Sequence, residues 1–262
     1  MGSLATIKVL MDKHTPSTVT WIRAELLRIS KLPGFHLTIK VLDIGSSTGI
    51  IWRRVASGGW LYRNGIELKI CLFDASPETS GKQSSDENLI FEFRKGIAPS
   101  DLGSFSSEEF DLITAFDIIE HLTKDQGYHL LYEINRLAPT SIIRCPNGFV
   151  WQPPFASNPY QAHISGWSPR ELRAIGWRRQ FGECGLKVLV GIGSVPKWKL
   201  SSNKVRWLIS FPERIILAAS QLWLYRFPGL CAEIVAIKRE RAFDLERYII
   251  EQDSSGHTST TY

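Results

Sequence analysis

Three groups of residues in this sequence have the types and the spacing of a ligand-binding site. The first is an aspartate followed by a turn of small residues, DIGSSTG at 43–49. The second is a single carboxylate, Asp74, which lies 25 residues after Gly49. The third is the stretch FDIIEH at 116–121, in which two carboxylates and an imidazole follow an apolar run. Together these groups could bind a polar ligand and transfer a proton.

The small residues of the first turn let a ligand approach the backbone, and a helix beginning behind them would offer unpaired N–H groups. Taken alone, such a turn is equally typical of a plain tight connection. A carboxylate such as Asp74 can accept hydrogen bonds from both hydroxyls of a ribose, but it could also cap a helix beginning near Ser76. The occurrence of both features in consecutive units favours nucleoside binding.

Two histidines are candidates for a general base, because the imidazole titrates near neutral pH. His121 follows the apolar run directly, and His163 lies in a long loop containing several prolines. A packing or capping role for His121, and a surface role for His163, remain the alternatives. Trp151 and Tyr160 could line a pocket for a substrate or simply anchor the same loop.

Apolar runs alternate with amphipathic segments along most of the chain, which predicts an α/β protein with a doubly wound sheet. The expected strands are 39–44, 68–73, 89–93, 111–116, 141–145, 186–192 and 232–237. The expected helices are 15–31 with Thr15 as its N-cap, 50–56, 123–137 after a capping box, and a helix from 168 to a glycine C-cap at 185. The binding groups then lie where strands end, at one edge of the sheet.

In motif order and spacing, VLDIGSSTG, LFDASPE and FDLITAFDIIEHL resemble the class I S-adenosylmethionine-dependent methyltransferases, in particular the type 11 small-molecule group. The resemblance covers roughly residues 39–192. It implies a doubly wound, seven-stranded, mostly parallel sheet of the Rossmann-like methyltransferase fold with its last strand antiparallel. It also implies S-adenosyl-L-methionine as the cofactor.

The resemblance also implies a role for individual residues. Those lining the methionine part of the cofactor would be Asp43, Gly45, Ser46, Ser47 and Gly49. Those facing the methionine end from the fourth strand would be Ala115, Phe116 and Asp117. Those near the nucleoside would be Asp74 at the ribose, Ala75 beside the adenine, and Ile97, whose backbone N–H could meet the adenine.

Two residues depart from the family pattern. Ser47 replaces the middle glycine of the turn, and Ile97 stands where an acidic residue often meets the adenine amine. These departures leave open a catalytically weak pseudo-methyltransferase that acts as a membrane-associated binding module. A nicotinamide dehydrogenase is disfavoured, because the turn lacks the G-x-G-x-x-G spacing.

The net charge of +5 is concentrated in one segment. Residues 197–230 contain six Lys and Arg residues against one Glu, and six aromatic residues lie among them. Such a segment is expected to be helical, inserted before the last strand, and either a lid over an apolar acceptor, an element contacting an anionic membrane, or a hairpin packed on the sheet. Nucleic acid is not expected as a partner, since no recognition motif is present.

The sequence therefore predicts one methyltransferase domain over residues 1–251 and a disordered tail at 252–262. The predicted reaction is methyl transfer to oxygen or carbon of a small acceptor that is apolar or linked to a lipid or glycan. The expected location is cytoplasmic, with peripheral attachment to a membrane as a variant. Four cysteines without pair spacing predict neither a disulfide framework nor a zinc cluster, and no metal site is expected.

Overall fold

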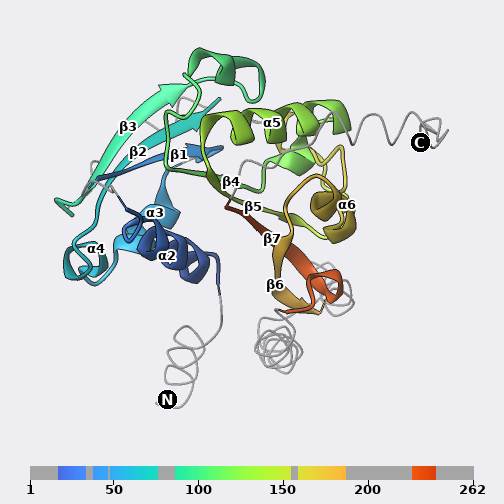
Figure 1. Cartoon of the computed structure of the whole chain (residues 1–262). Coiled ribbons are helices and arrows are strands. Elements are labelled where there is room, and N and C mark those ends of the chain that lie inside the picture. Colours follow the sequence, from blue (N-terminus) through green and yellow to red (C-terminus); the bar gives the residue numbers. More distant parts are fainter. Residues whose placement is uncertain are drawn as a thin grey trace, which may run out of the picture.

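The chain forms a seven-stranded sheet with helices on both faces, as Figure 1 shows. The coordinates are a computed structural model. It describes residues 17–33, 38–46, 48–75, 86–154, 159–186 and 226–239.

The strand order confirms the predicted fold. In sheet order the strands are β3 (Leu89–Lys95), β2 (Glu67–Asp74), β1 (Thr38–Ile44), β4 (Leu112–Phe116), β5 (Thr140–Pro146), β7 (Cys231–Lys238) and β6 (Arg179–Leu186). The pairs among β1 to β5 are parallel, whereas β7 runs antiparallel to both β5 and β6. From β1 the chain adds β2 and β3 on one side of the sheet and then β4 and β5 on the other. The carboxyl ends of β1 and β4 therefore flank the position where open α/β sheets bind ligands.

The alternation of side chains along each strand divides the core into two layers. Leu42 and Ile44 of β1 face one layer and Val41 faces the other. The layer with Val41 is covered by α2 (Thr18–Ile29), α3 (Ile50–Ala56) and α4 (Trp60–Arg63). The opposite layer is covered by α5 (Lys124–Leu137) and α6 (Pro169–Ala174). Short 3₁₀ turns complete the connections: η2 (Ser100–Ser104), η3 (Ile119–His121), η4 (Pro159–Gln161) and η6 (Pro228–Leu230).

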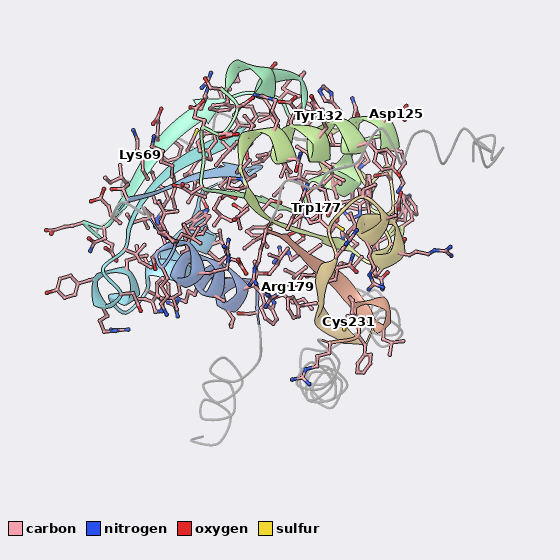
Figure 2. The ribbon with its side chains drawn as sticks, viewed as in Figure 1. Lys69, Asp125, Tyr132, Trp177, Arg179 and Cys231 are labelled. Carbon is pink, nitrogen blue, oxygen red and sulfur yellow. The ribbon has the colours of Figure 1, made fainter. Side chains whose placement is uncertain are left out.

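Large side chains fill the space between the sheet and the helices. Trp177 is fully buried beneath α5 and α6, while Lys69 and Asp125 lie on the outside of the molecule (Figure 2). Burial of this many apolar side chains is the main source of stability for the fold, at roughly 25 cal/mol per Å² of apolar surface.

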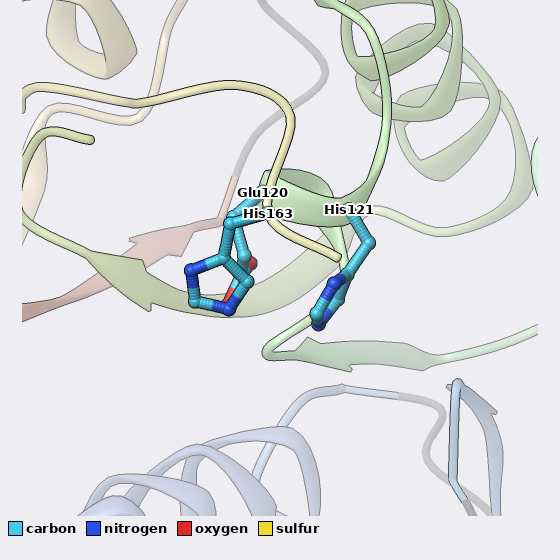
Figure 3. A group of neighbouring side chains, drawn as sticks. All are labelled: Glu120, His121 and His163. Carbon is cyan, nitrogen blue, oxygen red and sulfur yellow. The ribbon is translucent and has the colours of Figure 1, made fainter. Parts of the chain in front are cut away.

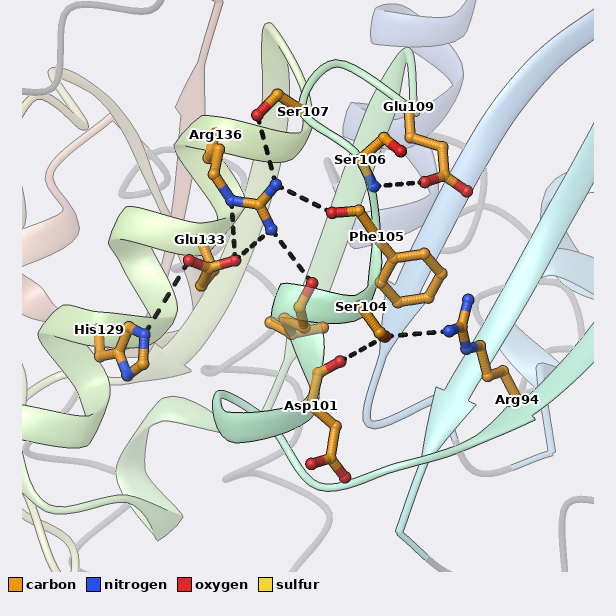
Figure 4. A network of polar contacts seen from close by, with 11 residues as sticks. Arg94, Asp101, Ser104, Phe105, Ser106, Ser107, Glu109, His129, Glu133 and Arg136 are labelled. Atoms are coloured by element: carbon orange, nitrogen blue, oxygen red, sulfur yellow. Dashed lines mark hydrogen bonds and ion pairs between the residues drawn. The ribbon is translucent and has the colours of Figure 1, made fainter.

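The helix α5 is held in place by a polar network as well as by its apolar stripe. Its N-terminus carries the predicted capping box, in which Thr123 and Gln126 bond each other's backbone N–H groups. Near its C-terminus, Arg136 donates to Glu133 and to the backbone carbonyls of Leu102 and Phe105, at 3.1 and 2.9 Å respectively (Figure 4). The network therefore joins α5 to η2 across the end of the sheet.

Three predicted boundaries are wrong. The helix after Ser168 ends at Ala174 instead of reaching residue 185, because Gly176 takes a positive φ of 105° and closes the helix there. The next strand, predicted at 186–192, consequently begins at Arg179. In addition, α2 has Ser17 as its N-cap, two residues after the predicted Thr15, and the Ser17 N–H donates to the Thr20 hydroxyl at 3.3 Å.

Three predicted features lie outside the described residues: Ser47, most of the basic segment 197–230, and the tail 252–262. Among the residues that the structure describes, no helix has both the length and the apolar character that crossing a membrane would need.

Candidate functional site

A cavity of about 190 Å³ opens where β1 and β4 end. It is lined by Asp43, Ile44, Gly45, Ser46, Ile50, Ile51, Arg54, Phe116 and Arg144. The structure thus places the aspartate and the glycine of the first turn beside the end of the fourth strand, as expected. The two guanidinium groups in its wall, from Arg54 and Arg144, were not expected.

The turn after β1 requires glycine for packing as well as for its backbone conformation. Gly45 has a φ of 69°, and its N–H donates to the carbonyl of Phe73 at 2.8 Å. A Cβ at this position would lie 1.9 Å from the side chain of Ile118. The turn, β2 and the segment after β4 are therefore packed directly against one another, which fixes one wall of the cavity.

Asp43 is the most unusual acid in the site, because it is 2% exposed. Its Oδ1 accepts a hydrogen bond from the Thr114 hydroxyl at 2.6 Å. Burial raises the pKa of Asp43 to about 7, and the Asp74 carboxylate adds to the shift, although the Thr114 hydroxyl and the Trp52 indole act in the opposite direction. A cation brought into the cavity would stabilise the ionised form of this carboxyl.

Arg144 crosses the site from β5 and joins several acids. Its guanidinium binds both carboxylate oxygens of Asp117, with Nε 3.1 Å from Oδ1, and also reaches the Thr18 hydroxyl at 3.2 Å. Although burial acts to lower it, the neighbouring carboxylates of Asp117 and Glu233 raise the pKa of Arg144. Asp117 itself has a φ of 56°, a conformation that few non-glycine residues adopt. The cavity wall therefore presents a fixed arrangement of both charges.

The nucleoside side of the predicted site is only partly described. Asp74 and Ala75 are half-buried at the end of β2, next to the turn after β1. Ile97 is 47% exposed, and its backbone N–H donates to Asp101 Oδ2 at 2.8 Å. In this conformation that N–H is not available to an adenine.

His121 and His163, predicted separately, lie together. Their ring centroids are 4.8 Å apart in an edge-to-face arrangement, and Glu120 lies beside both (Figure 3). Burial lowers the pKa of His121, and His163 contributes to this shift, while the carbonyls of Ala162 and Asp117 oppose it. Burial raises the pKa of Glu120 to about 8. Two imidazoles and a buried carboxyl thus share one space just beyond β4.

A set of hydrogen bonds, called the frame below, joins the segment that carries His121 to the loop that carries His163. The indole N–H of the fully buried Trp167 donates to the Ile119 carbonyl at 3.2 Å and to the Ser165 hydroxyl at 3.0 Å. The N–H groups of Ile164 and Ser165 both donate to the Glu120 carbonyl, at 2.9 and 3.1 Å. The segment carrying His121 is therefore tied to the loop carrying His163.

The variant Gly127→Ala tests this frame. Alanine favours a helix over glycine by about 1 kcal/mol, yet a Cβ on Gly127 would lie 2.3 Å from the Trp167 ring. Because Trp167 is fixed by its hydrogen bonds, we expect a loss of about 1–3 kcal/mol in the free energy of unfolding, measured by urea denaturation. Gly103→Ala is the control, since a Cβ there meets nothing within 4 Å. Equal stability of both variants would contradict the frame.

The two aromatic residues predicted to line an acceptor pocket are exposed. Trp151 is 74% and Tyr160 is 59% accessible to solvent. They share a loop region with His163, whose N–H donates to the Gln152 carbonyl at 3.1 Å. Among the described residues, these two side chains therefore lie on an open surface and do not enclose the predicted acceptor pocket.

Two side chains of the candidate site, Glu120 and Arg144, are not predicted by the sequence analysis. Glu120 was seen only as part of the motif that ends in His121, and Arg144 only as a member of an apolar strand. The available signal for Arg144 was a charge within SIIRC, a run otherwise suited to a fully buried strand. A charged residue in such a run needs a partner, and in this structure the partner is Asp117.

Comparison with known proteins gives no family model and no curated protein that matches the chain. Solved structures do match at low similarity. A proposed sarcosine dimethylglycine methyltransferase from Galdieria sulphuraria is 15% identical, with 86% of this chain and 85% of that chain covered and a TM-score of 0.45. A SAM-dependent methyltransferase from Archaeoglobus fulgidus is 19% identical, with 88% and 98% covered and a TM-score of 0.43. These scores are too low to carry an argument, so the fold assignment rests on the sheet topology.

Proposed function

We propose that this protein is an S-adenosyl-L-methionine-dependent methyltransferase that moves a methyl group to oxygen or carbon of a small acceptor. The observation that supports this most strongly is the cavity at the ends of β1 and β4, which is lined by the Asp43 carboxyl and by the guanidinium groups of Arg54 and Arg144. The methionine part of S-adenosylmethionine carries one ammonium and one carboxylate, so its charges match a cavity wall of this composition. The ammonium would pair with Asp43, and the carboxylate would pair with Arg54 or Arg144.

The residues present fit the methyl donor on two further counts. The Ser46 hydroxyl is buried and has no hydrogen-bond partner among the described residues, so it can bind a ligand at the cavity. Asp74 stands at the end of the neighbouring strand, where its two oxygens could accept the hydroxyls of a ribose. When bound, the donor supplies a methyl group made electrophilic by its positive sulfur, so the protein's task is mainly alignment.

The acceptor would enter on the side of His121 and His163. If the reacting group is a hydroxyl, the proton released as the C–O bond forms would pass to one of these imidazoles. The exposed Trp151 and Tyr160 suit an apolar acceptor or the apolar part of one linked to a lipid or glycan. The basic aromatic segment 197–230 would then close over the acceptor or contact an anionic membrane surface.

A second candidate is a binding module of the same fold with little or no activity. The observation that favours it is the Ile97 N–H, which is already bonded to Asp101 instead of being open to an adenine. This candidate predicts that millimolar S-adenosylmethionine gives no binding signal.

Calorimetric titration with S-adenosylmethionine separates the two candidates. We expect the wild-type protein to bind the donor, and Asp74→Ala to bind it more than about tenfold more weakly, because a charge-assisted contact is worth about 1.5–3 kcal/mol. Asp125→Ala is the matched control, since Asp125 is exposed on α5. Wild-type affinity in Asp74→Ala would refute the site assignment, and absence of wild-type binding would refute the proposed activity.

A further inference from the structure

We propose that Glu120, His121 and His163 form a binding site for one divalent transition-metal ion. One ligand atom from each of the three side chains lies within 4.8 Å of the other two. Figure 3 shows the Glu120 carboxylate behind the His163 ring, with the His121 ring to one side of both. Spacing along the chain does not indicate a metal here, because His163 lies more than forty residues after Glu120 and His121.

Hydrogen bonding shows which nitrogen of each histidine remains available to an ion. His121 Nδ1 lies 3.0 Å from the Ala162 carbonyl, and His163 Nδ1 lies 2.7 Å from the Val150 carbonyl. A carbonyl oxygen only accepts, so each Nδ1 must carry a hydrogen. In the neutral rings, both Nε2 atoms then hold a free electron pair. A backbone carbonyl behind each ring is the usual support of a metal-binding histidine.

The third ligand, Glu120, is buried with an oxygen that lacks a partner. The residue is 2% exposed, and Oε2 forms no hydrogen bond among the described residues. Asp117 and Glu233 add negative charge nearby, against which Arg144 supplies one positive charge. Burial of an unpaired carboxylate is costly. A cation between Glu120 and the two Nε2 atoms would remove that cost.

The chemistry of the ligand set selects the class of ion. Two imidazoles and one carboxylate suit Zn²⁺, Mn²⁺, Fe²⁺ or Co²⁺ and are poorly suited to Ca²⁺. Ligand distances of about 2.0–2.2 Å place tetrahedral ligand atoms about 3.3–3.5 Å apart. The ligand atoms, which now lie up to 4.8 Å apart, must therefore approach one another by up to about 1.5 Å on binding. Three protein ligands leave at least one coordination position open for water or a substrate oxygen.

This site bears on the proposed function without depending on it. With an ion bound, His121 and His163 would act as ligands and not as bases, and an acceptor oxygen in the open position would lose its proton to solvent more readily. Only this activation of an acceptor oxygen rests on the proposed methyl transfer. Metal binding itself is measured without any methyl donor.

The competing arrangement needs no metal. A proton held between Glu120 and one imidazole would also satisfy the buried oxygen, as a neutral pair or as an ion pair. Both arrangements are compatible with the same three positions, and a direct titration distinguishes them.

The test is a titration of chelator-treated full-length protein with Co²⁺, followed by its visible absorption. We expect d–d bands that saturate at one ion per chain, and displacement of Co²⁺ by Zn²⁺. Glu120→Gln and His163→Ala should each weaken Co²⁺ binding by at least about 10–100-fold, the range that loss of a supporting contact alone can produce. His129→Ala is the matched control, because His129 is an exposed histidine on α5.

Folding is checked in the same samples. Glu120→Gln keeps the size of the side chain, and His163→Asn provides a second loop variant, each compared with wild type by circular dichroism and by thermal melting with and without Co²⁺. The ion should raise the melting temperature of the wild type and of His129→Ala only. Co²⁺ binding that is absent in the wild type, or unchanged in a folded Glu120→Gln or His163→Asn variant, would overturn the site. Donor binding by calorimetry stays a separate readout, so failure of the metal site leaves the proposed function standing.

Discussion

Replacement of Asp43 by asparagine is expected to stabilise the unliganded protein above neutral pH while weakening its binding of the methyl donor. The carboxyl is buried, and burial raises its pKa to about 7, whereas an aspartate in the unfolded chain has a pKa of about 3.9. Between these values the folded state binds more protons than the unfolded state. Stability is therefore lost as the pH rises from about 4 to about 7, and the loss is complete above that window.

The size of the effect follows from the shift. About three pKa units correspond to about 4 kcal/mol, so Asp43→Asn and wild type should differ little at pH 4 and by up to about 4 kcal/mol at pH 8, with the variant more stable. Urea denaturation at several pH values measures this. Asp125→Asn, an exposed substitution on α5, should leave the pH dependence unchanged. Parallel pH profiles for Asp43→Asn and wild type would contradict the buried-acid interpretation.

The second large effect is expected for Arg144→Met. The guanidinium holds Asp117 in a conformation with positive φ and lines the candidate donor cavity. Breaking a fully buried ion pair costs about 3–5 kcal/mol. Here the Asp117 side chain is 46% exposed, so solvent screens its charge. We therefore expect the free energy of unfolding to fall by about 1–3 kcal/mol. Donor binding should fall at least tenfold in the same variant.

A double-mutant cycle separates the two consequences. The variant Arg144→Met with Asp117→Asn should recover part of the lost stability, since the unpaired carboxylate is gone, yet donor binding should stay weak. Arg178→Met, an exposed substitution between α6 and β6, is the control. A double variant no more stable than Arg144→Met would contradict the role of the ion pair in stability. Donor binding that returned in the double variant would contradict a direct role of Arg144 in binding the donor.

The sequence predicted most strands because their signals are local. The apolar run before Asp43 and the one before Asp117 each end in the residues that mark the binding edge of the sheet, and both strands lie where expected. The helix after Ser168 was misjudged because two glycines, Gly176 and Gly185, offered the same C-cap signal. The pairing of β6 with β7, which begins at Arg179, requires the helix to close at Gly176 and not at Gly185.

Only those residues of the candidate site that lie in short sequence motifs could be predicted from the sequence. The residues around the first turn and Asp74 belong to short motifs, so their type and spacing indicated a role. The convergence of Glu120 with His163, and of Arg144 with Asp117, depends on how strands and loops meet in space. Sequence patterns carry no direct information on such contacts between distant segments.

The position of β7 also sets the order in which the molecule can fold. The strand is inserted between β5 and β6, so neither can join the other until Cys231–Lys238 has left the ribosome. The salt bridge between Glu25 on α2 and Arg239 also forms late, because the two residues are 214 positions apart in the chain. Such distant contacts slow folding. Until then the growing chain exposes the open edge of β5, so we expect it to need a chaperone during synthesis.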